Sequence, residues 1–198
     1  MIHVDPPFDL GETLQGTKDN DGTNLINDQW VGAIYHFPDV DRTPSPRGGG
    51  KNRRSGQTVK AIIVRNTSGG ALTAAKKCLK IDLTPADTRH FMGAVDGQCS
   101  AVNQVGGVGD NELADTVPVN DLFWLIISGP AECLVKTGET HAVGSLLCSS
   151  ATAGSLALAT SGSAAVAVAS AANVIARATI AGTSSATAVV VNVCSNIG

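Results

Sequence analysis

The sequence has few aromatic residues and almost no charge after residue 139. Only seven of the 198 side chains are Phe, Trp or Tyr, and Arg177 is the one charged residue from 140 to 198. No apolar stretch reaches the roughly 18 residues of a membrane-spanning helix, and Ser, Thr and Gly interrupt the uncharged tail 151–176. The N-terminus lacks the basic and apolar regions of a signal peptide. We therefore expect synthesis in the cytoplasm and no contact with a membrane.

The sequence also lacks the motifs that mark most enzymes and metal sites. The string Arg47-Gly-Gly-Gly-Lys51 resembles a phosphate-binding loop, but Asn52 follows the lysine and no strand precedes it. There is no GxSxG turn, no HExxH pair and no CxxC pair. Asp115 and Asp121, the nearest thing to an acid–base pair, flank an apolar run, where turn and strand ends are expected. The sequence predicts no enzyme, no cofactor and no metal site.

The five cysteines indicate small buried side chains. They are odd in number and widely spaced, and Cys133 and Cys148 lie inside apolar runs. Free cysteine is among the most frequently buried residue types. Unpaired thiols are typical of proteins kept in a reducing compartment.

Charge is separated into blocks along the chain. Residues 1–41 carry eight acidic side chains and one basic one, residues 42–80 carry ten basic side chains and no acidic one, and residues 81–139 are again mainly acidic. Such blocks favour binding to a surface of opposite charge. The basic block suits an acidic protein surface, a solvated loop or nucleic acid. Nucleic acid is the least favoured partner, because 38–90 has no aromatic residue for base stacking and the net charge is −3.

β-Branched residues predict strands after residue 57. Residues 58–66 form the clearest strand, and Thr67-Ser-Gly-Gly70 is a turn. This turn favours a hairpin in which residues 76–83 return along 58–66. Residues 90–95 are a short apolar run, and the glycines of 104–111 favour a loop.

The densest apolar stretch of the chain predicts an antiparallel meander. A strand within 118–130 is followed by strand-like segments at 131–135 and 142–148, spaced by about ten residues. In the tail, alanine favours helix, but β-branched residues and glycine spacing favour strands. The four tail strands that we expect are 155–160, 164–170, 174–179 and 187–194.

These patterns predict an all-β fold with a barrel-like or sandwich-like body. We assign residues 58–198 to the β domain and residues 1–57 to an extended, irregular N-terminal arm, because the prolines and glycines of 43–56 exclude a helix or a central strand. We expect the β domain to fold without the arm. Aromatic residues in a loop-like arm suit anchoring on a partner, and the basic block suits a complementary surface. The residues that we expect to bind a partner are Trp30, Tyr35, Phe37, Arg42, Arg47, Lys51, Arg53 and Arg54.

Three stretches of the sequence resemble a known class of proteins. They are Val64-Arg-Asn-Thr-Ser-Gly-Gly-Ala-Leu72, His90-Phe-Met-Gly-Ala-Val-Asp-Gly97 and Val117-Pro-Val-Asn-Asp-Leu-Phe-Trp-Leu-Ile-Ile-Ser-Gly-Pro-Ala131. In this order they resemble virion proteins of tailed bacteriophages that are interpreted as capsid decoration proteins, also called cement or head-stabilisation proteins. The resemblance covers residues 58–198, and NDLFW…SGPA is its most specific part.

The resemblance implies a structural virion protein on the outer face of an icosahedral capsid, assembled in the host cytoplasm. Proteins of this class bridge neighbouring major capsid subunits, commonly as homo-trimers or homo-dimers. The major capsid protein is therefore the expected partner. The alternatives are a glycan-binding or host-binding virion module, an internal DNA-facing head protein, and a tail or connector protein.

Overall fold

The computed structural model confirms the all-β fold. The structure describes residues 5–19, 23–41, 52–82, 93–101, 104–113, 116–159, 174–183 and 188–195. These residues form thirteen strands and one short 3-10 turn, η1 (Asp28–Trp30). The strands are β1 (Thr13–Leu14), β2 (Ile34–Asp41), β3 (Asn52–Asn66), β4 (Cys78–Ile81), β5 (Ala94–Gln98), β6 (Gly106–Gly109), β7 (Leu122–Leu134), β8 (Thr140–His141), β9 (Leu146–Ser149), β10 (Leu156–Leu158), β11 (Ala176–Ala178), β12 (Gly182–Thr183) and β13 (Ala188–Cys194). Eleven strands make one large mixed sheet, and β8 pairs with β12 separately.

The large sheet is not a simple barrel, but part of it closes into a ring. The pairings run from β7 through β6, β4, β5 and β3 and return to β7. Apolar side chains of one core cluster, including Ile62, Leu79, Val95 and Leu125, alternate along these strands. Side chains alternate between the two faces of a strand, so this cluster fills the inside of the ring.

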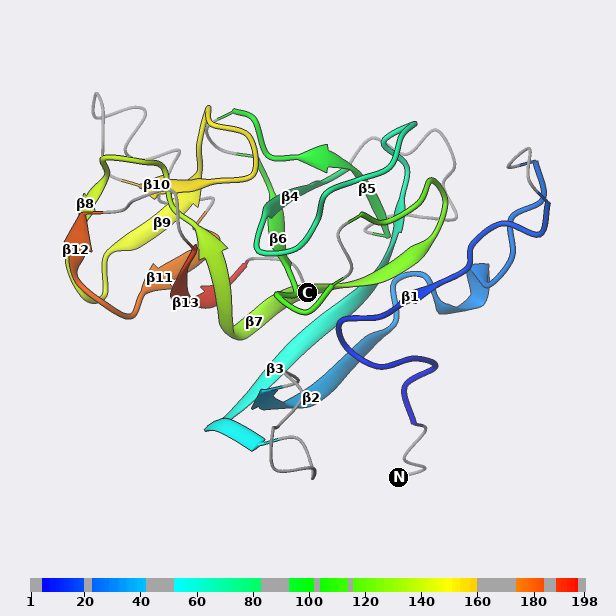
Figure 1. The fold of residues 1–198 in the computed structure, drawn as a ribbon, viewed down its shortest axis with the longest axis horizontal. Helices are drawn as coiled ribbons and strands as arrows, with labels where there is room; N and C mark the ends of the chain where they lie inside the picture. The colour runs from blue at the N-terminus through cyan, green and yellow to red at the C-terminus, as the bar shows by residue number, and fades with distance from the viewer. Residues whose placement is uncertain are drawn as a thin grey trace.

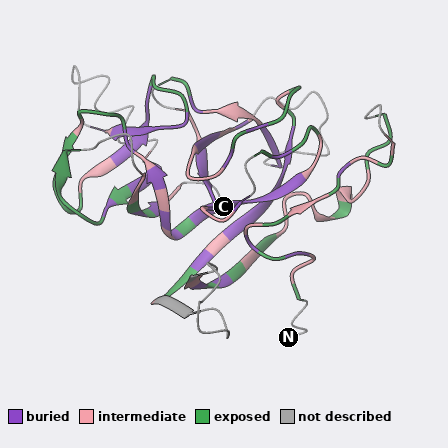
Figure 2. Cartoon of the chain, viewed as in Figure 1, coloured by how far each residue is buried: buried purple, intermediate pink, exposed green. Residues whose placement is uncertain are grey.

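The second half of the chain extends the sheet from the other part of β7. Here β7 pairs with β13, which is followed by β11, β9 and β10. A parallel bridge between Val135 and Leu156 brings β10 back beside the end of β7. The long strand β7 therefore belongs to both halves of the sheet, and Figure 1 shows it between them. It is also mostly buried (Figure 2).

The predicted meander is wrong, because Gly129 and Pro130 do not end a strand. They lie within β7, where Gly129 has a φ of +100° and a Cβ at this position would lie 2.4 Å from the carbonyl oxygen of Thr58. The glycine thus lets β7 bend while β3 passes close to it. The apolar runs 118–130 and 131–135 are one strand, and 142–148 pairs with the tail instead of with β7.

The predicted hairpin between 58–66 and 76–83 is also wrong. The turn at 67–70 is present, but β4 pairs with β5 and β6, and β3 pairs with β2, β7 and β5. Leu72 instead forms a bridge with Val117, which carries the chain away from β3. A local turn signal did not reveal this distant partner.

The glycine-rich stretch predicted as a loop contains β6. Ideal Cβ atoms at Gly107 and Gly109 would lie 2.6 Å from the Ile126 oxygen and 2.0 Å from the Ala74 oxygen. A ring of only five strands has a narrow interior, and these two glycines make room for the large side chains around them. Packing between strands therefore overrides the loop preference of glycine.

The predicted tail strands agree well with the structure. Residues 155–160, 174–179 and 187–194 contain β10, β11 and β13. The fourth predicted strand, 164–170, lies outside the described residues.

The N-terminal residues pack onto the body. The Trp124 indole N–H donates to the Phe8 carbonyl oxygen at 3.1 Å, and β2 pairs along β3. Phe8, Leu10 and Phe37 belong to the core. The boundary that we predicted after residue 57 lies inside β3, which is continuous from Asn52 to Asn66. The described residues of 5–41 are irregular outside β1, η1 and β2, yet they complete the hydrophobic core.

We therefore expect that deletion of residues 1–57 destabilises the body instead of releasing it. The deletion removes β1, β2, the first part of β3 and three core side chains. Loss of a single buried Phe typically costs about 3–5 kcal/mol, so the truncated chain should lack cooperative thermal unfolding by circular dichroism. A truncated chain that melts like the full-length protein would show that residues 58–198 are an independent domain.

A methyl group at Gly109 should destabilise the five-stranded ring. Gly109→Ala places a Cβ against the Ala74 backbone, and such overpacking costs about 3 kcal/mol, or about 9 °C in Tm. Gly70→Ala is the matched control, because no atom lies within 4 Å of its Cβ position. The explanation of β6 fails if both variants melt at the same temperature in calorimetry.

Candidate functional site

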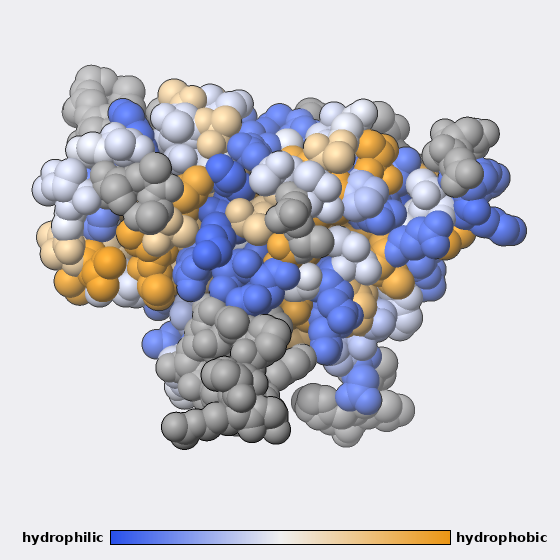
Figure 3. Space-filling model, in the orientation of Figure 1, coloured by the Kyte–Doolittle hydropathy of each residue, from blue (hydrophilic) through white to orange (hydrophobic). Residues whose placement is uncertain are grey.

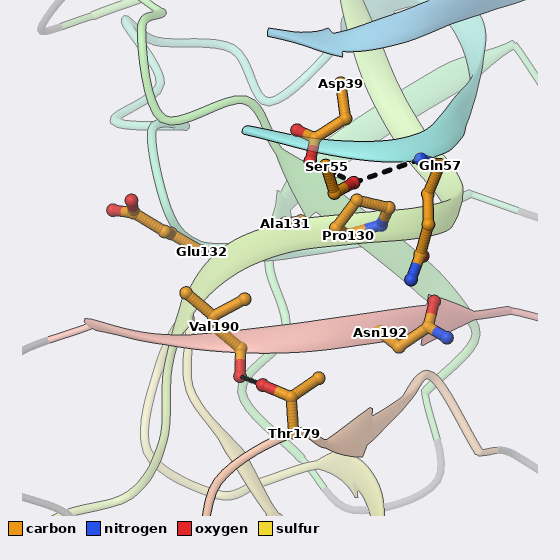
Figure 4. Close-up of a pocket in the computed structure, with 9 residues that line it drawn as sticks. All are labelled: Asp39, Ser55, Gln57, Pro130, Ala131, Glu132, Thr179, Val190 and Asn192. Carbon is orange, nitrogen blue, oxygen red and sulfur yellow. Dashed lines mark hydrogen bonds between the residues drawn. The ribbon is translucent and has the colours of Figure 1, made fainter. Parts of the chain in front are cut away.

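A groove opens where β3 and β7 separate. The two strands pair from Lys60 to Arg65, while β7 continues beyond Ser128 beside β13. The resulting hollow has a volume of about 510 Å³. Figure 4 shows its lining residues, which come from β2, β3, β7, β13 and the segment after β11. They are Asp39, Ser55, Gln57, Pro130, Ala131, Glu132, Thr179, Val190 and Asn192.

One wall of the groove is a hydrogen-bonded bulge in the β2–β3 hairpin. Pro38 pairs with Thr58, but Val40 pairs with Arg53, so β3 has extra residues opposite Asp39. The Ser55 hydroxyl donates to Asp39 Oδ2 at 2.7 Å and accepts the Gln57 backbone N–H at 3.1 Å. These bonds hold the bulge together, and a bulge protects a sheet edge from pairing with another strand.

The floor and the opposite wall mix polar and apolar groups. Pro130 and Ala131 of β7 form the floor. Glu132 forms an ion pair with Lys76 at 2.8 Å, and the Thr179 hydroxyl donates to the Val190 oxygen at 2.5 Å. Among the described residues, no group of His, Cys, Asp or Glu has the arrangement of a metal site. The groove offers hydrogen-bonding groups and apolar contacts, which suit binding a surface.

Beside the groove lies an uncharged, partly apolar end of the molecule. Val143 and Ile180 are 67% and 50% exposed, and Val190 on the groove wall is 45% exposed. The segments of Val143 and Ile180 pair through β8 and β12, and the Gly144 N–H donates to the Ala178 oxygen at 2.8 Å. Figure 3 shows hydrophobic residues gathered at the end where β8 and β12 lie. We call Val143, Ile180 and Val190 the apolar end.

The apolar end belongs to the part of the chain that lacks charge. From 140 to 198 the sequence has only Arg177, which is exposed on β11. The centres of protein interfaces are similarly poor in charged residues. Exposed apolar side chains grouped on one surface are typical of interaction sites.

Three of the residues that we predicted to bind a partner pack within the protein itself. Phe37 is 9% exposed and lies edge-on to Trp124, with ring centroids 4.9 Å apart. Tyr35 contacts the same indole at 5.4 Å, and Trp30 packs against the same core cluster. These aromatic side chains stabilise the N-terminal segment on the body.

The predicted basic contacts fall largely outside the described part. Arg42, Arg47 and Lys51 lie outside the described residues, and Arg53 and Arg54 lie in β3 without described side chains. Their role in binding stays a prediction. Asp115 also lies outside the described residues, whereas the carboxylate of Asp121 accepts the Gly16 N–H at 2.9 Å.

The expected burial of the cysteines is confirmed for four of the five. Cys78, Cys99, Cys133 and Cys148 are buried, and Cys194 is half-buried; all five are free thiols.

The three stretches that carry the resemblance meet at Arg65 and Asn66. Arg65 donates to the Asn120 oxygen at 2.6 Å, and its backbone N–H donates to the Gly93 oxygen at 2.7 Å. The Asn66 amide donates to the Val117 and Pro118 oxygens at 2.9 and 3.0 Å. The three stretches therefore meet where β3 ends and β7 begins.

Arg65 also fixes the N-terminal segment. Its guanidinium donates to the Gly16 oxygen at 3.1 Å and the Ile26 oxygen at 3.0 Å, and it forms an ion pair with Asp28. Burial lowers the pKa of Arg65, and the carboxylate of Asp28 opposes this effect. The buried cation is thus stabilised by acceptors from three separate segments.

Sequence reasoning missed the groove, because its lining comes from five separate segments whose meeting depends on the bend in β7. The signal for the apolar end was present in the sequence as the absence of charge after residue 139.

No known protein family, curated protein or solved structure matches the chain. Within the described ranges there is no helix of the length and hydropathy that crossing a membrane requires.

Removal of the Arg65 guanidinium should release the N-terminal segment. Arg65→Met removes a donor from the oxygens of Gly16, Ile26 and Asn120, of which Gly16 keeps the Ile26 N–H, and should cost about 3 kcal/mol. Trypsin should then cut faster after Lys18, as followed by mass spectrometry of the native protein. Lys76→Met is the control, because its ion pair with Glu132 is partly exposed and contributes less than about 1 kcal/mol. Equal cleavage rates in the two variants would contradict this role.

Proposed function

We propose that this chain is a structural virion protein that binds the outer face of an icosahedral bacteriophage capsid. It stabilises the shell by bridging major capsid subunits. The observation that carries the proposal is the apolar end beside the groove, a surface suited to binding protein. The resemblance of residues 58–198 to capsid decoration proteins supplies the identity of the partner.

The chemistry of the apolar end supports a protein partner. The side chains of Val143 and Ile180 are exposed but form no hydrogen bonds with water. They lie in a part of the chain with a single charged residue. Burying such a surface releases water without leaving charges unpaired. The groove beside it adds hydrogen-bonding groups that fix the orientation of the partner.

The stabilising effect follows from mass action. A protein that binds the assembled shell, but not its separated subunits, shifts the equilibrium towards the shell. A homo-dimer or homo-trimer holds several capsid subunits at once, so weak single contacts add up to strong attachment. The basic residues Arg47, Lys51, Arg53 and Arg54 contribute contacts to acidic shell residues, and salt weakens these contacts over a Debye length of about 8–10 Å.

Electron cryo-microscopy of particles that contain this chain tests the proposal. We expect regular density on the outer face of the head, which mild denaturant removes to leave a shell that breaks at a lower temperature. Density inside the shell, at the portal or on the tail would contradict it and favour a DNA-facing, connector or tail protein.

Charged residues at the apolar end should prevent capsid binding without unfolding the protein. Val143→Glu and Ile180→Glu place carboxylates on exposed positions, so Tm should change little. Heads that lack this chain should bind each variant at least about tenfold more weakly in co-sedimentation. Val119→Glu is the control, because Val119 is 37% exposed and lies in the turn before β7. Equal binding by all three variants would place the contact elsewhere.

A further inference from the structure

Two of the buried cysteines face each other across neighbouring strands. Leu79 of β4 pairs with Gln98 of β5, so the next opposite pair in this antiparallel ladder is Cys78 and Cys99. The Cys99 N–H donates to the Cys78 oxygen at 2.9 Å, which confirms that the ladder continues to this pair.

The side chains of this pair lie on the same face of the sheet. Cys78 and Cys99 both belong to the core cluster outside the ring, together with Cys133, whereas Leu79 belongs to the cluster inside it. Both cysteines are fully buried.

The spacing of such a pair suits a disulfide. Opposite residues of antiparallel strands have Cα atoms about 4.5–5.5 Å apart. Disulfides join Cα atoms at about 4.4–6.8 Å. Residues in this register therefore lie within the span of a disulfide.

The surroundings leave room for the bond and hold the two backbones in place. Gly106 on β6 has no side chain, and a Cβ there would lie 3.2 Å from Cys99 Sγ. Gly154 donates its N–H to the Cys99 oxygen at 2.8 Å and accepts the Cys78 N–H at 2.9 Å. The turn at Gly154 thus fixes the ends of β4 and β5 against each other.

We propose that Cys78 and Cys99 are a latent disulfide, which burial keeps reduced and which a thiol oxidant closes when β4 and β5 open locally. Each thiol gives up its hydrogen, the two sulfurs form one bond, and the oxidant takes up two electrons and two protons. Contact with Cys99 and burial raise the pKa of Cys78. Because the thiolate is the reactive form, the closed protein reacts slowly. This inference is independent of the proposed function.

Oxidation of the intact protein with diamide tests the pair. Diamide is reduced to the hydrazine as the disulfide forms, and iodoacetamide then blocks the remaining thiols. Trypsin with a Glu-specific protease separates Cys78, Cys99 and Cys133 into different peptides, because Lys77 and Lys80 flank Cys78 and Glu112 lies between Cys99 and Cys133. We expect the Cys78 and Cys99 peptides to be joined, faster in low urea than in buffer.

Two variants and a melting curve sharpen the test. Cys133→Ser should leave the cross-link unchanged, and Cys78→Ser should abolish it. The cross-link closes a loop of about 20 residues, so the oxidised protein should melt about 5–10 °C higher. A bond from Cys133, Cys148 or Cys194 to either cysteine, five free thiols after oxidation in low urea, or a lower Tm on closure would overturn the proposal.

Discussion

The burial of one guanidinium determines how this fold closes. Arg65 is 2% exposed, and a buried charge without partners is strongly unfavourable. Its acceptors come from Gly16, Ile26 with Asp28, and Asn120, which lie far apart in the sequence. The N-terminal segment, the end of β3 and the entry to β7 must therefore come together for the charge to be satisfied. Asn66 adds the Val117–Pro118 backbone to the same point.

Away from Arg65 and Asn66, the packing of the ring depends on side chains of very different size. On the outside of the ring, the side chains of Phe8, Tyr35 and Phe37 pack around the indole of Trp124. Inside the ring, Gly107 and Gly109 leave space for Leu125 and Leu79. Glycines among the large side chains of the inner face let a five-stranded ring close, while the N-terminal segment covers its outer face. The same bend at Gly129 that separates β3 from β7 opens the groove.

The strand content could be predicted from sequence, but the pairing of the strands could not. The β-branched residues of 58–66 and 187–194 identify β3 and β13, because a local pattern suffices for them. The Gly129-Pro130 pair is a turn signal, yet it bends β7, because the close approach of Thr58 requires a glycine there. We predicted Tyr35 and Phe37 to be exposed anchors, because the sequence does not show that they pack on Trp124, which lies nearly ninety residues away. The apolar end was visible as missing charge, whereas the groove needs the full topology.

The position of β7 in both halves of the sheet has a consequence for biosynthesis. A ribosome releases β2 and β3 before β5 and β7, and β13, which covers the other part of β7, follows later. Until β5 and β7 emerge, β3 has only β2 beside it, and its apolar residues face water. Folding dominated by such distant pairings is slow. The ring therefore cannot close until β7 has been synthesised, and the second part of β7 stays uncovered until β13 follows.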